Sequence, residues 1–135
     1  MGVVDSPPGV DAVVLTGREM DVMNVLWTLE SATVSEVLEN LPDDLAYTTV
    51  LTILRRLEKK GHVRHEEQGK AHRYFPRVRR EEAQDSAIKR VTQKLFHDSP
   101  ELLMTRLLRK GGVTEEQLRS LRALLDERLK EGEEE

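Results

Sequence analysis

Apolar residues recur at helical spacing in six stretches of the chain, and three of these stretches open with the same polar signal. Thr16–Glu19, Thr33–Glu36 and Thr114–Gln117 each place a threonine three residues before a glutamate or glutamine. This spacing is typical of a capping box, in which two side chains satisfy free N–H groups at the start of a helix. The pattern therefore predicts helices over 16–30 and 33–41, and a last helix that starts near residue 114.

The middle of the chain changes from helical to extended spacing. A third helix is predicted over 47–60 and ends at Gly61, because glycine readily adopts the left-handed conformation that closes helices. Two short extended runs follow, 62–66 and 71–75, with Gly69 in the turn between them, and they predict a β-hairpin. Three helices followed by a hairpin are typical of a winged helix-turn-helix, whose third helix enters the major groove of DNA.

The remaining helices are predicted over 80–97 and 100–110 and from 114 to about 130. We therefore expect a mostly α fold with a small β-hairpin wing. The expected domains are a flexible N-terminal tail (1–14), a winged-helix DNA-binding domain (15–78), a helical dimerisation domain (79–131) and an acidic tail (132–135). Three short helices make a poor independent core, so their leucines are expected to bury against a second copy of the chain. The expected dimer contacts are Leu103, Leu107, Leu118, Leu121, Leu125 and Leu129.

The third predicted helix has two distinct faces. At about 100° per residue, its four central aliphatic side chains form one narrow buried stripe. These are Val50, Ile53, Leu54 and Leu57. Threonines near the start of the helix and cations near its end occupy the outward face, which suits a helix that touches base edges. We expect the base-reading residues to be Thr48, Thr49, Thr52, Arg55 and Arg56.

The distribution of charge supports DNA binding. The chain of 135 residues has a net charge of −4, yet residues 45–80 hold ten Lys/Arg against three acids, a net charge of +7. Such a block is typical of a surface that binds a polyanion, although it also fits a solvated basic surface. The adjacent Tyr74 and Phe75 are interpreted as packing between the wing and the core. We expect contacts to the DNA backbone from Tyr47, Lys59, Lys60, Arg64, Lys70 and Arg73.

Other chemistry has little support in the sequence. The chain holds no cysteine, which excludes disulfides, thiolate metal sites and cysteine nucleophiles. It has no phosphate-binding glycine loop and no nucleophile elbow, so we expect neither an enzyme nor a cofactor. Its histidines are interpreted as solvated or DNA-adjacent, with a metal site between His65 and His72 as the alternative. No apolar stretch approaches the ~18–20 residues that cross a bilayer, and no signal peptide is expected, so we expect a cytoplasmic protein with no membrane insertion.

Three segments are similar to the BlaI/MecI penicillinase repressor family, which also includes the CopY copper-responsive repressors. They are EMDVMNVLW at Glu19–Trp27, YTTVLTILRRLEKKG at Tyr47–Gly61 and HRYFP at His72–Pro76. The resemblance spans about Leu15 to Leu129. It implies a homodimeric winged-helix repressor that binds a palindromic operator and regulates an antibiotic-resistance or stress operon.

The chain departs from two branches of that family. The copper-responsive branch carries a C-terminal cysteine cluster, which is missing here. In the branch inactivated by proteolysis, an Asn-Phe bond in the fifth helix is cut after a membrane sensor-protease detects a β-lactam. The matching position here is Arg106-Leu107. The resemblance therefore implies a sensor-protease partner, while the arginine indicates either an altered protease specificity or a different release signal.

Two other functions stay open from the sequence. The chain could be a winged-helix adaptor that docks another protein, or a repressor that responds to a metal through its histidines. The salt dependence of binding distinguishes the first alternative from DNA binding. Affinity for DNA falls steeply as the salt concentration rises, whereas the affinity of an apolar docking surface for its partner does not. Zinc-dependent operator affinity would identify the second.

Overall fold

The computed structural model describes residues 13–134, and the chain divides into two compact units after Val91. Most of the expected N-terminal tail lies outside the described residues. Val13, which was assigned to that tail, is buried with a side chain 2% exposed. The first unit therefore begins before the expected boundary at residue 15.

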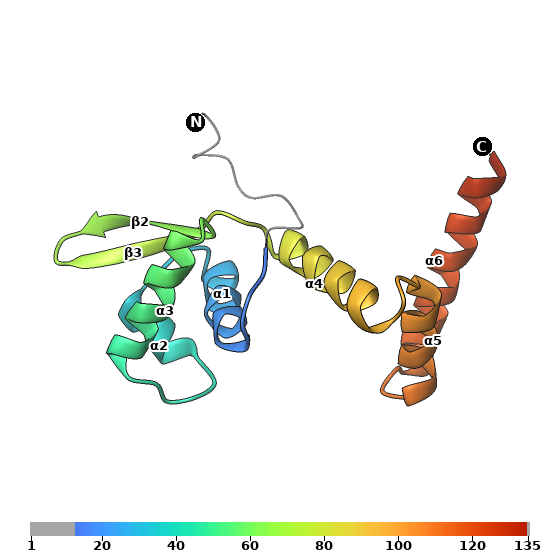
Figure 1. Ribbon diagram of the computed structural model, residues 1–135, viewed down its shortest axis with the longest axis horizontal. Coiled ribbons are helices and arrows are strands. Elements are labelled where there is room, and N and C mark those ends of the chain that lie inside the picture. Colours follow the sequence, from blue (N-terminus) through green and yellow to red (C-terminus); the bar gives the residue numbers. More distant parts are fainter. Residues whose placement is uncertain (1–12, 135) are drawn as a thin grey trace. The chain divides into compact units, whose positions relative to one another are not determined.

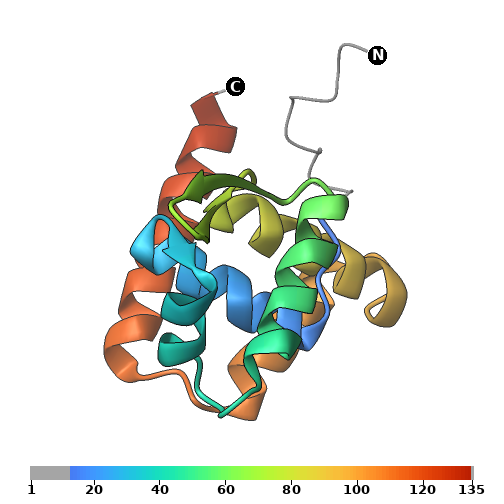
Figure 2. The ribbon, with the colours of Figure 1, turned by 90° about the vertical axis from the view of Figure 1, so that its left-hand side faces the viewer.

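Three helices form the body of the first unit: α1 (Gly17–Leu29), α2 (Val34–Asn40) and α3 (Tyr47–Lys59). Thr16 and Thr33 cap α1 and α2 with complete capping boxes, which confirms the sequence prediction. α3 follows Ala46, whose side chain makes no capping hydrogen bond, and is closed by Gly61 at a φ of 86°. The three helices pack against one another, as Figures 1 and 2 show.

A small antiparallel sheet joins the three helices. Its strands are β1 (Ala32–Thr33), β2 (Val63–Gln68) and β3 (Ala71–Pro76), in the order β1-β3-β2. The predicted hairpin is confirmed, and it extends past the helices as a wing (Figure 1). The sequence did not predict β1, which at two residues is too short to show an alternating pattern. It pairs Ala32 with Tyr74 and so anchors the base of the wing.

The core of the first unit lies between the helices and the sheet. Val22, Met23 and Leu26 of α1 meet the buried stripe of α3, and Tyr74 closes the core from the wing with a side chain 1% exposed. The interpretation of Tyr74 as a packing residue is confirmed. Trp27 is half-buried against this core, and its Nε1 donates a hydrogen bond to the carbonyl of Val78 at 2.9 Å.

The fourth helix, α4 (Arg80–Leu95), starts inside the first unit. The buried Ser86 hydroxyl donates to the carbonyl of Val13 at 2.7 Å, and Ala83 packs on the core. The division after Val91 therefore differs from the boundary at residue 79 that the sequence pattern indicated. The reason is that these small side chains hold the start of α4 against the winged-helix core without forming a strong apolar stripe.

The second unit, taken by itself, contains α5 (Pro100–Lys110) and α6 (Glu115–Glu134). Ser99 caps α5, and Thr114 and Gln117 form the third predicted capping box. The expected acidic tail over 132–135 needs a correction, because α6 continues as a helix to Glu134. Its Glu-Arg pairs, such as Glu115 with Arg119, support an exposed helix of this composition. Within the described residues, no helix is long and apolar enough to cross a membrane.

Candidate nucleic-acid interface

α3 presents a continuous exposed face opposite its buried stripe. The four aliphatic side chains predicted to be buried are at most 4% exposed, so the two-faced reading of this helix is confirmed. The outward side chains come from consecutive turns of a single rigid helix. They are Tyr47, Thr48, Thr49, Thr52, Arg55 and Lys59, all exposed.

Thr52 has a fixed hydrogen-bond role within this face. Its Oγ1 donates to the carbonyl of Thr48 one turn earlier, at 2.9 Å. This bond uses the hydroxyl proton, so the oxygen remains an acceptor and the γ-methyl remains available for apolar contact. A threonine in this state can accept from a base amino group or touch a thymine methyl.

The four cations at the end of α3 separate into two pairs. Within the described part of the chain, Arg55 and Lys59 make no side-chain hydrogen bond or ion pair. Arg56 and Lys60 both bind the Glu19 carboxylate of α1, with Nε to Oε2 at 2.9 Å and Nζ to Oε1 at 2.7 Å. The structure thus leaves one pair available to a polyanion and uses the other to join α3 to α1.

Sequence reasoning predicted Glu19 as a capping residue of α1 and missed its contacts with Arg56 and Lys60. Its side chain is 0% exposed, and its Oε1 also accepts from the backbone N–H of Thr16 at 2.8 Å. Burial alone would raise the pKa of Glu19, but hydrogen bonds from Lys60, Thr16 and Arg56 outweigh it and lower the pKa to about 2. A signal was present in the sequence, because Glu19 falls on the same helical stripe as Val22, Met23 and Leu26.

The wing carries cations in three different settings. Arg64 pairs with Glu66 at 2.8 Å and lies over the Phe75 ring, 4.2 Å from its centre. Arg73 binds Ser31 and Glu36 near the base of the wing, and it also donates to Gln68 at the turn end of β2. Lys70 sits in the turn and, among the described residues, has no ion-pair partner. Arg64 and Lys70 are therefore exposed on the wing, and Arg73 holds it to α2.

The two wing histidines meet across the hairpin, as the metal-site alternative required. Their rings stack with centres 4.5 Å apart, and the Nδ1 of His65 lies 2.6 Å from Oε2 of Glu58. Stacked rings turn their faces rather than their nitrogen edges toward each other. Among the described residues, no group of three His, Asp or Glu side chains is arranged to hold a metal ion.

The leucines expected to form a dimer are largely exposed. In the second unit, Leu103 is half-buried and the other five are exposed, from 42% for Leu121 to 68% for Leu129. No side chain of α5 is buried, and those of α6 are exposed as far as they are described. Arg106 and Leu107, the expected cleavage position, are exposed in the middle of α5.

Comparison with known proteins places this arrangement in a family. The chain matches the penicillinase repressor family over residues 15–127. It is 22% identical over 116 residues to the methicillin resistance regulatory protein MecI of Staphylococcus aureus strain N315, which covers 84% of this chain and 94% of that protein. It is 49% identical over 61 residues to the transcriptional regulator BlaI of Mycobacterium tuberculosis strain H37Rv, which covers 43% of this chain and 44% of that one.

A solved structure, that of the DNA-binding domain of the repressor BlaI, is 29% identical with a TM-score of 0.48 and covers 53% of this chain and 89% of that chain. The family match extends through both units, from the N-terminal segment of the core to α6. The chain therefore belongs to the penicillinase repressor family of DNA-binding transcriptional repressors, and it is not an enzyme.

Proposed function

We propose that this repressor acts as a homodimer that binds a palindromic operator, with α3 in the major groove and the β2–β3 wing on the flanking backbone. One observation carries the proposal: the exposed face of α3 combines threonines with two cations that have no partner among the described residues. An acid-free face of this kind approaches a polyanion without desolvating a carboxylate.

The roles of the individual side chains follow from their settings. We propose that Thr48, Thr49, Thr52 and Arg55 read base edges, because they stand on the outward face of α3. Tyr47, Lys59, Arg64 and Lys70 contact phosphates. Arg56 and Lys60 act through Glu19, by fixing the angle at which α1 holds α3. Arg73 acts by holding the wing in place.

Dimerisation is proposed to occur through the exposed leucines of α5 and α6. An apolar surface of this extent on a monomer indicates a protein contact, and a two-fold dimer matches an inverted repeat. Linking two DNA-binding units raises operator affinity by ~10²–10⁴ through effective concentration, with no new contact. Separating the two copies would therefore release the operator without any change in α3.

The proposed regulatory role is control of an antibiotic-resistance or stress operon. It is supported by relatives whose names describe methicillin resistance and penicillinase control. A repressor that acts on chromosomal operators works in the cytoplasm, so the proposed location is cytoplasmic.

Release by a membrane sensor-protease is the proposed induction route. The Arg106-Leu107 bond lies within helical α5, so the helix must unwind locally before a protease can bind it. Gly111 and Gly112, at φ of 93° and 82°, end α5 one turn later and give a point from which it can fray. Mass spectrometry of the repressor from cells exposed to a β-lactam tests this route. We expect a fragment ending at Arg106, and intact repressor in cells with induced target genes would contradict the proposal.

DNA binding is tested with duplexes selected from a random library by the full-length protein. We expect an inverted repeat, and an affinity whose logarithm falls with log salt by about 0.9 per neutralised phosphate. Thr52→Ala should change the selected sequence, whereas Lys70→Ala should weaken all duplexes about equally. Arg119→Ala, on α6, is the matched control. Failure to select any duplex would favour the protein-docking adaptor, and an affinity for DNA that depends on zinc would favour the histidine alternative.

A further inference from the structure

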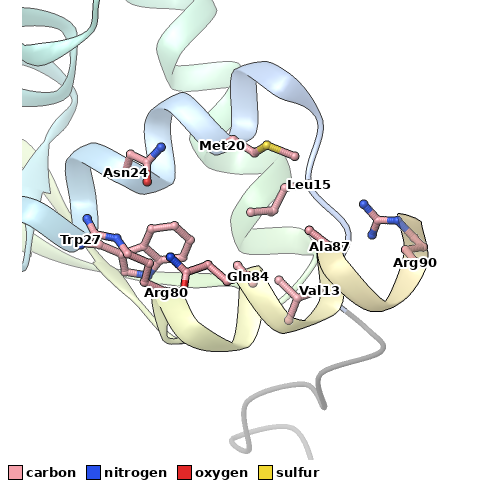
Figure 3. Close-up of a pocket in the computed structure, with 10 residues that line it drawn as sticks. Val13, Leu15, Met20, Asn24, Trp27, Arg80, Gln84, Ala87 and Arg90 are labelled. Carbon is pink, nitrogen blue, oxygen red and sulfur yellow. The ribbon is translucent and has the colours of Figure 1, made fainter. Parts of the chain in front are cut away.

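The first unit contains a pocket that takes no part in the face of α3 described above. Its volume is about 200 Å³, and it lies between the segment 13–15, α1 and the start of α4. Figure 3 shows Trp27 and Arg80 at one end of the pocket and Arg90 at the other. All of its lining residues belong to the first unit.

The charged side chains that line the pocket indicate the charge of the ligand it would bind. Arg80 and Arg90 line the pocket, and none of the described residues that line it is acidic. Arg80 donates to the Thr28 hydroxyl at 3.2 Å, and its guanidinium lies 5.6 Å from the centre of the Trp27 ring. Neither contact neutralises its charge. Two cations that share a pocket with no acid among its described lining residues indicate an anionic ligand.

Arg90 supplies a second, independent observation. Its Nη1 is buried and has no hydrogen-bond partner among the described residues. Burying an N–H group without an acceptor is unfavourable, and such a group is satisfied by a water, an ion or another bound molecule. Because Arg90 lines the pocket, a carboxylate bound there would accept hydrogen bonds from its guanidinium.

The remaining lining residues indicate that the uncharged part of the ligand is apolar. Leu15, Met20, Ala87 and the Trp27 ring give the pocket apolar walls, which favour a hydrocarbon group over a fully hydrated ion such as phosphate. A cavity of about 150 Å³ is large enough to hold benzene. The pocket therefore accommodates one six-membered ring together with a carboxylate.

We propose that this pocket binds a small carboxylic acid with an apolar ring, whose carboxylate accepts hydrogen bonds from Arg90. The ligand lies between α1 and α4, beside the Ser86–Val13 hydrogen bond that joins α4 to the segment preceding α1. It stabilises the first unit by holding them together, because any molecule that binds only the folded state raises stability. The site goes beyond operator binding and does not depend on it.

The test is isothermal titration calorimetry of the full-length protein with benzoate. Benzamide serves as the uncharged probe and benzylamine as the cationic probe of similar shape. We expect benzoate to bind at least tenfold more tightly than either. Trp27 is the only tryptophan of the chain, so its single indole N–H resonance in NMR spectra should shift when benzoate is titrated.

Variants separate this site from non-specific binding. Arg90→Gln should weaken benzoate binding at least tenfold, and Ala87→Leu should do the same by filling the pocket with no change of charge. Arg79→Gln is the matched control, because Arg79 lies beside α4 outside this pocket and is 79% exposed. Circular dichroism establishes that each variant is folded, and if Arg90→Gln is not, Ala87→Leu decides. Equal binding of benzoate and benzamide, unchanged binding by Arg90→Gln, or no binding of benzoate at millimolar concentration would each overturn the proposal.

Discussion

The Glu19 carboxylate has three partners that come from different parts of the chain. It completes the capping box of α1 with Thr16, and it binds Arg56 of α3 and Lys60, the C-cap residue of that helix. A buried carboxylate is stable only when hydrogen bonds and opposite charges compensate its lost hydration. Here that compensation comes from the same helix that carries the candidate DNA-binding face.

Replacing this carboxylate should destabilise the first unit. Glu19→Gln keeps the shape of the side chain and removes the charge, and we expect the free energy of unfolding to fall by about 3 kcal/mol, the equivalent of the lowered pKa. Denaturant unfolding measures the change. Glu39→Gln, at an exposed position of α2, is the control and should have little effect.

The same residue fixes the response to acid. The folded-state pKa of Glu19, about 2, lies below the ordinary value of 4.5. The stability it contributes is therefore fully present above pH 4.5 and is lost as the pH falls toward 2. Wild-type unfolding should show this loss, and the Glu19→Gln variant should show a flatter curve. Equal slopes in this range would contradict the assignment.

His62 predicts a second, milder acid effect. Its side chain is 2% exposed, and burial, together with the charge of Lys60, lowers its pKa below 6.5. The folded state therefore favours the neutral ring, and stability should decline as the pH falls below 6.5. His62→Leu should remove this decline between pH 6.5 and 4.5, where Glu19 stays ionised, as measured by denaturant unfolding. His72→Gln, at an exposed position, is the control and should retain the decline.

The wing and α2 are joined by a side chain that sequence patterns assign to DNA. Arg73 lies on β3, pairs with Glu36 at 3.1 Å and also binds Ser31, beside β1. These bonds connect the central strand of the sheet to the start of α2. They place the wing relative to the helices by contacts other than the β1–β3 ladder.

We expect Arg73 and Lys70 to behave differently when each is replaced by methionine. Arg73→Met should lower the free energy of unfolding by about 1 kcal/mol, since partly exposed pairs of this kind are individually modest. Lys70→Met should leave stability unchanged and reduce the salt slope of DNA binding by about 0.9. Thermal unfolding and salt titrations of the two variants make the comparison. A reversed pattern would show that Arg73 contacts phosphate and Lys70 supports the fold.

Local sequence signals predicted most of the helices and strands, whereas contacts between residues far apart in the chain could not be predicted. The capping boxes, the α3 stripe and Gly61 each act within a few residues, so α1, α2, α3 and the hairpin were predictable. β1 was not, because two residues carry no period. The same limit applied to the candidate site: its exposed face follows from helical spacing, whereas the separation of Arg55 and Lys59 from Arg56 and Lys60 depends on Glu19, which lies 37 residues before Arg56.

For the whole protein, stability and assembly are expected to be linked. The second unit leaves most of its leucines exposed, so its helices have little apolar core of their own within the described chain. If a second copy covers them, unfolding of this unit depends on protein concentration. The first unit has its own core, so its unfolding should not depend on protein concentration.

A charge within the proposed dimer surface tests this link. Leu121→Asp should convert a dimer to a monomer in analytical ultracentrifugation at micromolar concentration, because a buried unpaired carboxylate is strongly unfavourable. Affinity for a full operator should fall while affinity for a half-site stays the same. Arg122→Asp, at the next position of α6, controls for charge alone. A wild-type protein that sediments as a monomer and still binds a full operator tightly would contradict the dimer.

The division of the α3 cations also limits how such a repressor can diverge. A gene copy that evolves toward a new operator can change Thr48, Thr49, Thr52 or Arg55 one at a time, because none of these side chains belongs to the core. Changes at Arg56 or Lys60 instead leave the buried Glu19 with fewer partners, and they become tolerable only after position 19 changes as well. Among descendants of this protein, positions 19, 56 and 60 should therefore vary together, while the outward threonines drift independently toward new target sites.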